Sequence, residues 1–186
     1  MEFRQAQQVF RLLSYLLHYP DEEWEKGLRD CVEALEGIAH QRVVAGIRTF
    51  MEHARKQDPD ERMKAYVSIF DFGKKTNMYM TYSFAGEQRE RGFQLLNLKQ
   101  TYRNAGFDVT CCELPDYLPL ILEFSSLAED KFVFPVLRRC RKNISEIKTA
   151  LVDMNSHYAA LFQVLLDVLA NIGIKDDPEE RVEKTC

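Results

Sequence analysis

Apolar residues recur three or four positions apart along most of this 186-residue chain, and this spacing limits the fold more than any other feature. Residues at that spacing lie on one face of an α-helix, so each run predicts a helix with one buried face. Eight glycines and six prolines are too few for the frequent turns of a β-sandwich or barrel. The sequence therefore predicts an all-α fold, a single-domain helical bundle of eight or nine helices.

The apolar runs and the residues beside them place the helix ends. Predicted helices cover about 4–18, 21–37, 43–54, 58–70, 87–105, 114–128, 135–151 and 155–172. Asp21 and Asp58 are predicted N-caps, and Gly106 is the predicted left-handed residue that closes a helix. Pro119 and Pro135 are expected near helix starts, where a missing backbone N–H is tolerated.

Two stretches have less regular patterns. Residues 77–84 alternate between apolar and other positions, which suits a strand, but their helical neighbours favour a helix. Residues 175–186 are charged and nearly free of apolar side chains. We expect a helical domain over 1–174 and a disordered tail over 175–186.

The sequence does not carry the patterns of the common enzyme classes. Its four histidines fall at unrelated spacings, so no pair shares a helix face as a metal site requires. No glycine-rich phosphate loop is present, and no serine is framed by glycines as in hydrolases. Cys111 and Cys112 are neighbours with no second pair at zinc spacing, which favours two loop thiols over a redox role. We expect no enzyme activity and no tightly bound cofactor or metal.

Charge and cysteine content indicate the class of partner and the cellular compartment. The formal net charge of −4 disfavours binding to nucleic acid. The basic run Arg138, Arg139, Arg141 and Lys142 leaves a helical transcription regulator or other DNA-binding protein as the alternative, although a solvated helix face explains it as well. An odd number of cysteines suits a reducing cytosol, and no apolar run is long enough for a membrane span. The sequence predicts a cytoplasmic protein with no direct membrane insertion.

Two segments combine aromatic and acidic residues in a way that core packing alone explains poorly. The residues concerned are Tyr66, Phe70, Asp71, Phe72, Tyr79, Tyr82 and Phe84 in the first segment, and Glu113, Asp116, Tyr117, Glu123 and Phe124 in the second. Aromatic side chains with a polar tip are typical of peptide-binding grooves. If the second segment is helical, Asp116 and Glu123 share a face, and acidic residues beside apolar ones suit a basic amphipathic helix. Plain core packing and an acidic first helical turn are the alternatives.

In order and spacing, these segments resemble the NarJ branch of the TorD and DmsD family. The resemblance rests on Y-V-S-I-F-D at 66–71, M-T-Y at 80–82, R-G at 91–92 and E-L-P-D-Y-L-P-L-I-L-E-F at 113–124. It extends from about 10 to 172. The E-L-P-D-Y string stands where the TorD and DmsD branch has E-P-x-D-H, so Tyr117 replaces the histidine and no role of that histidine is carried over.

The resemblance implies a fold, a role and partners. Members of that family are cytoplasmic, all-helical assembly chaperones for molybdenum-containing reductases. This chain is then expected to bind the N-terminal segment of the catalytic subunit of respiratory nitrate reductase in an apolar, acid-rimmed groove. It would keep that client competent for molybdenum cofactor insertion, delay membrane assembly and be absent from the final enzyme.

The expected partners are the N-terminus and body of the client, with molybdenum cofactor biosynthesis proteins as further candidates. The client, not this chain, receives the cofactor, and this chain is expected to be a monomer or a weak homodimer. The implied peptide contacts are Tyr66, Phe70, Asp71, Tyr79, Tyr82, Glu113, Asp116, Tyr117 and Glu123.

Overall fold

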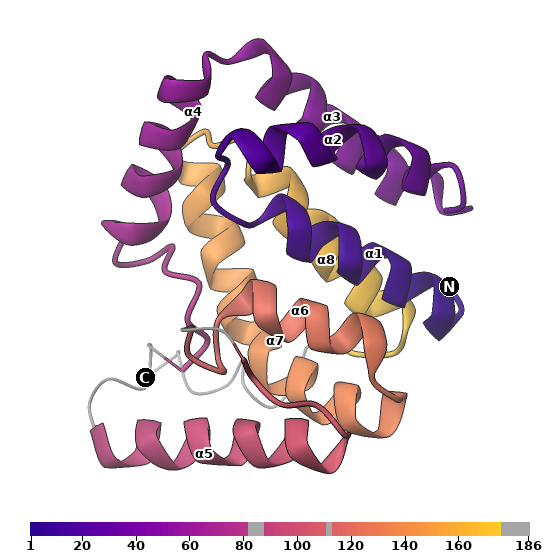
Figure 1. Cartoon of the computed structure of the whole chain (residues 1–186), viewed down its shortest axis with the longest axis vertical. Helices are drawn as coiled ribbons and strands as arrows, with labels where there is room; N and C mark the ends of the chain where they lie inside the picture. The colour runs from indigo at the N-terminus through magenta and orange to yellow at the C-terminus, as the bar shows by residue number, and fades with distance from the viewer. Residues whose placement is uncertain (82–87, 111–112, 176–186) are drawn as a thin grey trace, which may run out of the picture.

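The computed structural model describes residues 1–81, 88–110 and 113–175 as a bundle of α-helices (Figure 1). The helices are α1 (Phe3–Leu16), α2 (Glu22–Leu35), α3 (Gln41–Lys56), α4 (Pro59–Tyr66), α5 (Gln88–Asn104), α6 (Leu118–Leu127), α7 (Asp130–Asp153) and α8 (Ala159–Asn171), and a π-helical turn η1 (Val67–Asp71) extends α4. Within the described ranges there is no strand, only one isolated bridge. The predicted all-α bundle is therefore confirmed.

Helix α1 lies at the centre of the bundle, where other helices cover its apolar face. Its buried residues include Val9, Phe10, Leu13 and Leu16. It packs most extensively against α6 and also contacts α2 and α8, while α8 packs between α3 and α7 (Figure 1). One continuous hydrophobic core joins these helices. Burial of that core is the main stabilising contribution to the fold.

Several predicted helix ends are confirmed. The Asp21 side chain accepts a hydrogen bond of 2.9 Å from the Trp24 amide, and Asp58 accepts from the amides of Asp60 and Glu61 at 2.9 and 3.4 Å. Gly106 has φ of 85°, the left-handed conformation that glycine adopts without steric cost. These signals are local in sequence, which is why they could be identified without a structure.

Two predicted helix starts are wrong. Helix α6 begins at Leu118, not at 114, because Pro119 lies in its first turn and residues 113–117 form the turn before it. Asp116 therefore lies outside the helix and does not share a helix face with Glu123. Helix α7 begins at Asp130, so Pro135 lies inside the helix.

The segment predicted as a helix over 77–84 is not helical over 77–81. Residues 78–80 pair instead with 116–118: the Met80 amide donates to the Asp116 carbonyl, and the Leu118 amide donates to the Met78 carbonyl, each at 2.9 Å. Tyr79 and Tyr117 form an isolated antiparallel bridge. The rest of the 77–84 prediction, and the tail beyond 175, lie outside the described residues.

Helix α4 is fixed to the bundle by a buried arginine. The Arg62 guanidinium is 2% exposed and lies 5.2 Å over the Trp24 ring. It donates to the Glu25 carboxyl group at 2.7 Å and to the Ala54 carbonyl at 3.1 Å. A buried charge is tolerated only with such partners, so these contacts set the position of α4 against α2 and α3.

The π-helical turn η1 ends where the Phe72 amide donates to the Val67 carbonyl at 3.2 Å. Thr76 Oγ1 then donates to the Ile69 carbonyl, which the end of the helix leaves free. A Cβ atom on Gly73 would overlap both the Ile69 carbonyl and the Thr76 hydroxyl, so this position requires glycine. Turns of this kind occur often at functional sites.

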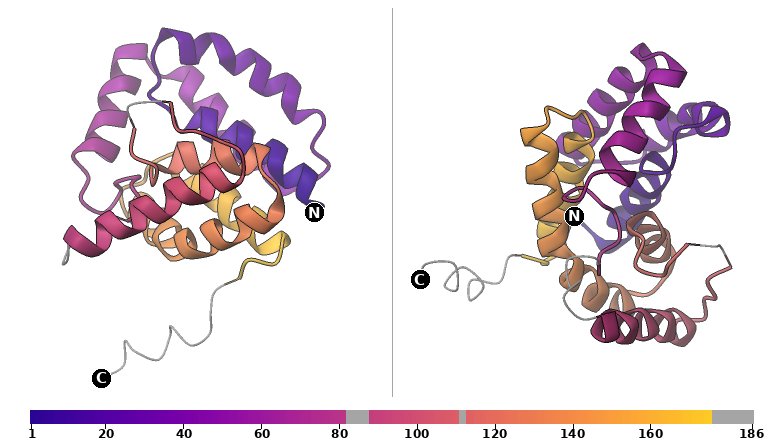
Figure 2. Two further views of the ribbon diagram at one scale, coloured as in Figure 1. Left: turned by 60° about the horizontal axis from the view of Figure 1, so that its bottom comes forward. Right: turned by 90° about the vertical axis from the view of Figure 1, so that its left-hand side faces the viewer.

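Helix α5 is packed differently from the others. Figure 2 shows it running across one end of the bundle. Of its described side chains only that of Tyr102 is buried. Its main contact is with α7, which leaves most of its surface open to solvent.

Candidate tyrosine cluster and adjoining hollow

Four tyrosines from three separate segments form a connected group, which we name the tyrosine cluster: Tyr19, Tyr66, Tyr79 and Tyr117. The Tyr19 ring meets the Tyr66 ring edge to face, with centroids 5.6 Å apart. The hydroxyls of Tyr66 and Tyr117 lie 3.1 Å apart, and the Tyr66 hydroxyl donates to the Leu17 carbonyl at 2.9 Å. The rings of Tyr117 and Tyr79 lie 5.3 Å apart.

Acidic side chains lie beside this cluster. The Tyr79 hydroxyl donates to Glu113 Oε2 at 2.6 Å. Burial, and then the charge of Glu113 and of Asp71, raises the pKa of Tyr117. Burial is also the largest cause of the raised pKa of Tyr66 and of Tyr79. These phenols are therefore neutral hydroxyl groups near neutral pH, and Asp71 and Glu113 supply the negative charge.

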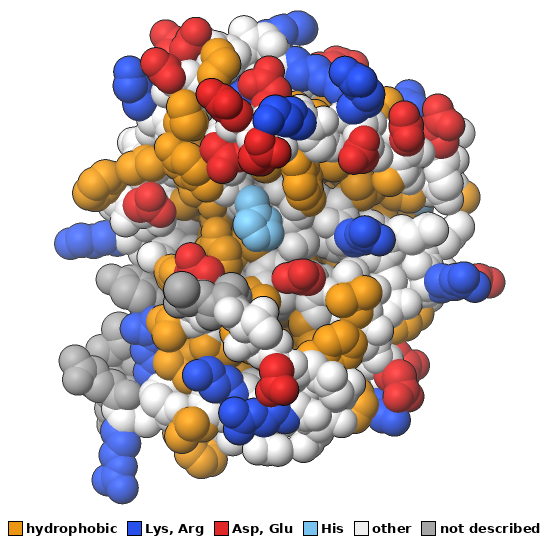
Figure 3. Space-filling view, in the orientation of Figure 1, with side chains coloured by type: hydrophobic (Ala, Val, Ile, Leu, Met, Phe, Trp, Pro, Cys, Tyr) orange, Lys and Arg blue, Asp and Glu red, His pale blue; other side chains and the backbone are white. Residues whose placement is uncertain are grey.

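A hollow of about 450 Å³ lies next to the cluster, on the outer side of α4 and η1. Its lining residues are Tyr19, Asp60, Met63, Lys64, Val67, Ser68 and Phe72. Phe72 is 80% exposed and Tyr19 is 44% exposed, so two aromatic side chains stand open to solvent there. Figure 3 shows hydrophobic side chains reaching the surface over α4 and η1, with acidic side chains around them. Tyr19 lines the hollow and packs against the buried Tyr66 of the cluster, so the hollow and the cluster adjoin each other at Tyr19.

Asp116 lies behind this surface and faces the interior. It is 0% exposed, and its Oδ2 accepts from the Thr81 amide at 3.0 Å and from the Thr81 hydroxyl at 2.6 Å. Arg91 Nε donates to the same hydroxyl at 3.3 Å. Asn143 Nδ2 donates to the Met80 carbonyl beside it. The carboxyl group of Asp116 thus holds residues 78–81 against the turn before α6.

The remaining predicted site residues fall in different surroundings. Phe70 is buried in the core, with its ring 4.9 Å from both Tyr66 and Tyr158. Glu123 is exposed on α6. Tyr82 lies outside the described residues. The structure brings Tyr66, Tyr79, Glu113 and Tyr117 together near Asp71, but Tyr66, Phe70 and Asp116 are buried and do not reach the surface. Whether any of the nine residues contacts a peptide stays a prediction.

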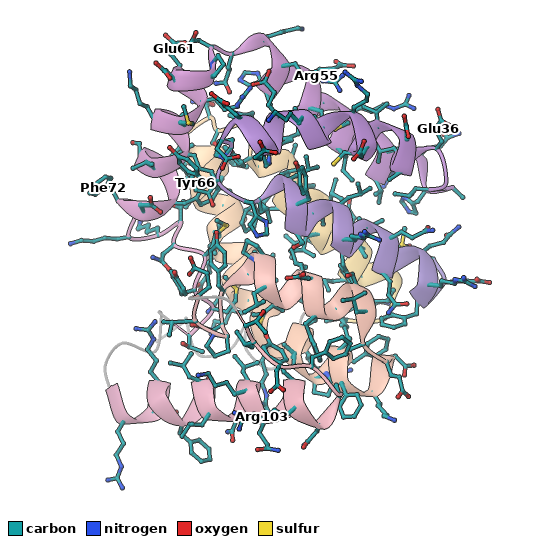
Figure 4. The ribbon with its side chains drawn as sticks, in the orientation of Figure 1. Glu36, Arg55, Glu61, Tyr66, Phe72 and Arg103 are labelled. Atoms are coloured by element: carbon teal, nitrogen blue, oxygen red, sulfur yellow. The ribbon has the colours of Figure 1, made fainter. Side chains whose placement is uncertain are left out.

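Sequence analysis did not select Tyr19, Met63 or Val67, and it named Phe72 as part of the first aromatic segment without selecting it as a site residue. A regular α-helix would put Met63 and Val67, which are four residues apart, on the same side as Tyr66 and Phe70. In the structure, Tyr66 and Phe70 face the core while Met63 and Val67 line the hollow. Figure 4 shows Tyr66 pointing inward and Phe72 pointing away from the bundle. With Ile69 and Phe72 included, the apolar positions from 63 to 72 cover an arc of roughly 220° at 100° per residue, which is too wide for one packed face and was the available signal.

Other candidate chemistries find little support in the part of the chain that the structure describes. It contains no group of three or more metal-ligating side chains and no helix long and apolar enough to cross a membrane. In the basic run, Arg138 and Arg139 are exposed, whereas Arg141 Nε donates to the Ile174 carbonyl at 3.0 Å. That bond gives one residue of the run a structural partner at the end of α8.

Comparison with known proteins identifies the family. The model of the nitrate reductase delta subunit family matches residues 35–164, well over half of the chain. The chain belongs to this family. The match includes both segments that carry the resemblance noted in the sequence, so membership of the NarJ branch is confirmed.

Individual relatives of the nitrate reductase delta subunit family agree with this assignment. A probable nitrate reductase molybdenum cofactor assembly chaperone NarJ of Bacillus subtilis (strain 168) is 43% identical over 98% of this chain and 100% of its own length. The nitrate reductase molybdenum cofactor assembly chaperone NarJ of Escherichia coli (strain K12) is 28% identical over 89% of this chain and 71% of its own. The nitrate reductase-like protein NarX of Mycobacterium tuberculosis is 31% identical over 81% of this chain but only 22% of its own.

Proposed function

We propose that this chain is a cytoplasmic chaperone for molybdenum cofactor assembly of a nitrate reductase. Its client is the catalytic subunit, which it keeps competent for cofactor insertion while membrane assembly is delayed, and it leaves before the enzyme is complete. Family membership supports this proposal, as do the names of relatives that align with nearly the whole chain. The molybdenum cofactor is cargo for the client, and the proposal assigns no reaction and no tightly bound cofactor to this chain.

The client's N-terminal segment is proposed to bind as an amphipathic helix across the hollow and the tyrosine cluster. Its apolar side chains would pack on Met63, Val67 and Phe72, where aromatic and aliphatic surface is already exposed. Its basic side chains would lie near Asp71 and Glu113, which flank the cluster. The observation that carries this proposal is that Tyr19 lines the exposed apolar hollow and also packs on the tyrosine cluster, which Asp71 and Glu113 flank.

The nine residues selected from the sequence divide by position. Asp71, Tyr79, Glu113 and Tyr117 are proposed to contact the peptide directly, because each is exposed or half-buried at this surface. Tyr66, Phe70 and Asp116 are buried. We therefore propose that they hold the tyrosine cluster in position without contacting the bound peptide. Glu123 on α6, and Tyr82, which lies outside the described residues, remain proposed contacts.

Calorimetric titration with a synthetic N-terminal peptide of the cognate catalytic subunit tests the proposal. The full chain should bind this peptide, and Phe72→Ser should weaken binding by at least about tenfold, because the change removes an exposed apolar anchor. Phe93→Ser is the matched control: it removes an exposed phenylalanine from α5, away from the hollow. The absence of binding at high peptide concentration, or an equal effect of both substitutions, would contradict the proposed site.

A further inference from the structure

The outward surface of α5 carries a pattern that the proposed client site does not use. We name this surface the α5 outer face: Arg89, Gly92, Phe93, Leu96, Lys99 and Arg103. At about 100° of rotation per residue these positions occupy one arc of roughly 120°, and all six are exposed. Phe93 is 64% exposed and Leu96 is 67% exposed, although helices that pack on a core turn such residues inward.

The charge of α5 differs in sign from that of the whole chain. The helix holds four basic residues and one acidic residue, Glu90, whereas the formal net charge of the chain is −4. Three of the basic residues lie on the outer face, on either side of Phe93 and Leu96. Figure 3 shows basic side chains gathered over α5 around an exposed hydrophobic one. Arg103 also lies 3.5 Å from Asp108, but both are exposed, and such a pair contributes little stability.

The space around the apolar pair suits a helix rather than a broad surface. Nothing lies within 4 Å of the place where a Cβ atom on Gly92 would stand, so the backbone is open beside Phe93 and Leu96. Two helices cross over a short patch, and small residues at the crossing let their axes approach closely. A membrane-binding helix needs apolar residues along its whole outer face, whereas α5 turns Leu95, Leu98 and Tyr102 away from this face.

The size of the patch argues for a transient partner. Two exposed apolar side chains supply a small fraction of the roughly 800 Å² per partner that a stable complex buries. A stable dimer of this chain through α5 would need a larger apolar area than this face offers. Opposite charge at the rim would instead increase the association rate and select the partner.

We propose that the α5 outer face is a docking surface for an acidic amphipathic helix of a partner protein. The apolar stripe of that helix packs on Phe93 and Leu96 across Gly92. Its acidic side chains pair with Arg89, Lys99 and Arg103. This surface is separate from the hollow at α4 and η1, so it gives the protein a second binding function.

Fluorescence anisotropy tests the proposal with the full chain and a labelled synthetic helix. The probe has a narrow leucine stripe flanked by glutamates and is used at concentrations where it is monomeric. Binding should weaken at high salt, and the double substitution Phe93→Ser with Leu96→Ser should weaken it by at least about tenfold. Val152→Ser on α7, at a residue that is 49% exposed, is the control and should leave binding unchanged.

Charge reversal on the α5 outer face gives an independent test of the proposal. The triple substitution Arg89→Glu, Lys99→Glu and Arg103→Glu should transfer the preference to a version of the probe with lysines in place of the glutamates. Equal binding of the acidic, basic and scrambled probes, or unchanged affinity in the double variant, would overturn the proposal. So would binding to phosphatidylglycerol vesicles through Phe93 and Leu96 without binding to the probe. Phe72→Ser should leave probe binding unchanged, which separates a failure here from a failure of the client site.

Discussion

Replacing Asp116 with alanine should destabilise the whole fold, because its carboxyl group is an interior hydrogen-bond acceptor. Asp116→Ala leaves the Thr81 amide and hydroxyl without their common acceptor at a site that is 0% exposed. An unpaired buried polar group costs about 1–3 kcal/mol, so the two together should lower the free energy of unfolding by about 2–6 kcal/mol. That is a large part of the roughly 5–15 kcal/mol that stabilises a typical domain.

Urea unfolding followed by circular dichroism measures this loss. Asp116→Asn keeps a side-chain oxygen that can accept from Thr81, so it should cost clearly less than Asp116→Ala. A double-mutant cycle with Thr81→Ala should give a coupling energy above about 0.5 kcal/mol, as residues in one hydrogen-bond network do. Glu123→Ala, at an exposed acidic residue, is the control and should stay within about 0.5 kcal/mol of the unmodified chain. If Asp116→Ala were as mild as that control, the structural role argued for Asp116 would be refuted.

Three further changes test other parts of the structure. Gly73→Ala should destabilise the protein by about 1–3 kcal/mol, because the new Cβ atom overlaps the Ile69 carbonyl; a thermal melt measures this, and an unchanged midpoint would contradict the tight turn. Tyr66→Phe should cost about 1 kcal/mol in urea unfolding, because the Leu17 carbonyl loses its hydroxyl donor. Burial, and then the nearby His53, lowers the pKa of His157 from 6.5 to about 4. The unfolded chain therefore takes up this proton at higher pH than the folded chain, and stability should fall as pH decreases from about 6.5 to about 4. His157→Phe should flatten that dependence in urea unfolding measured across this pH range, and an identical pH profile would contradict it.

Local signals in the sequence were sufficient for most helices and several of their ends. Asp21, Asp58 and Gly106 act on groups within three or four residues, so their roles follow from the sequence itself. The pairing of residues 78–80 with 116–118 joins segments nearly forty positions apart, and no periodicity reports it. Without that pairing, Leu-Pro-Asp-Tyr at 114–117 was interpreted as a helix start, and Asp116 as an exposed carboxylate.

The outer hollow was missed for a related reason. A regular α-helix over the predicted range 58–70 would place Met63, Tyr66, Val67 and Phe70 on one side. The π-helical turn at Val67–Asp71 widens the helix there, and Phe72 follows it on the exposed side. Helical periodicity alone gave no signal for this turn, and the contacts that accompany it, at Gly73 and at the Thr76 hydroxyl, lie beyond its end.

The buried position of Asp116 also changes what a binding experiment on this residue can mean. Tyr79 and Tyr117 are neighbours in the pairing that Asp116 holds, and the Tyr79 hydroxyl donates to Glu113. Loss of the Asp116 carboxyl group should release residues 78–81 and thereby move Tyr79 away from Glu113. Client-peptide binding should then fall with Asp116→Ala and recover with Asp116→Asn, in parallel with stability. A direct contact between Asp116 and a basic client residue predicts the reverse, since asparagine restores the hydrogen bonds but not the charge. Loss of peptide affinity in Asp116→Asn at unchanged stability would therefore show that Asp116 contacts the peptide directly and does not act only by holding residues 78–81 in place.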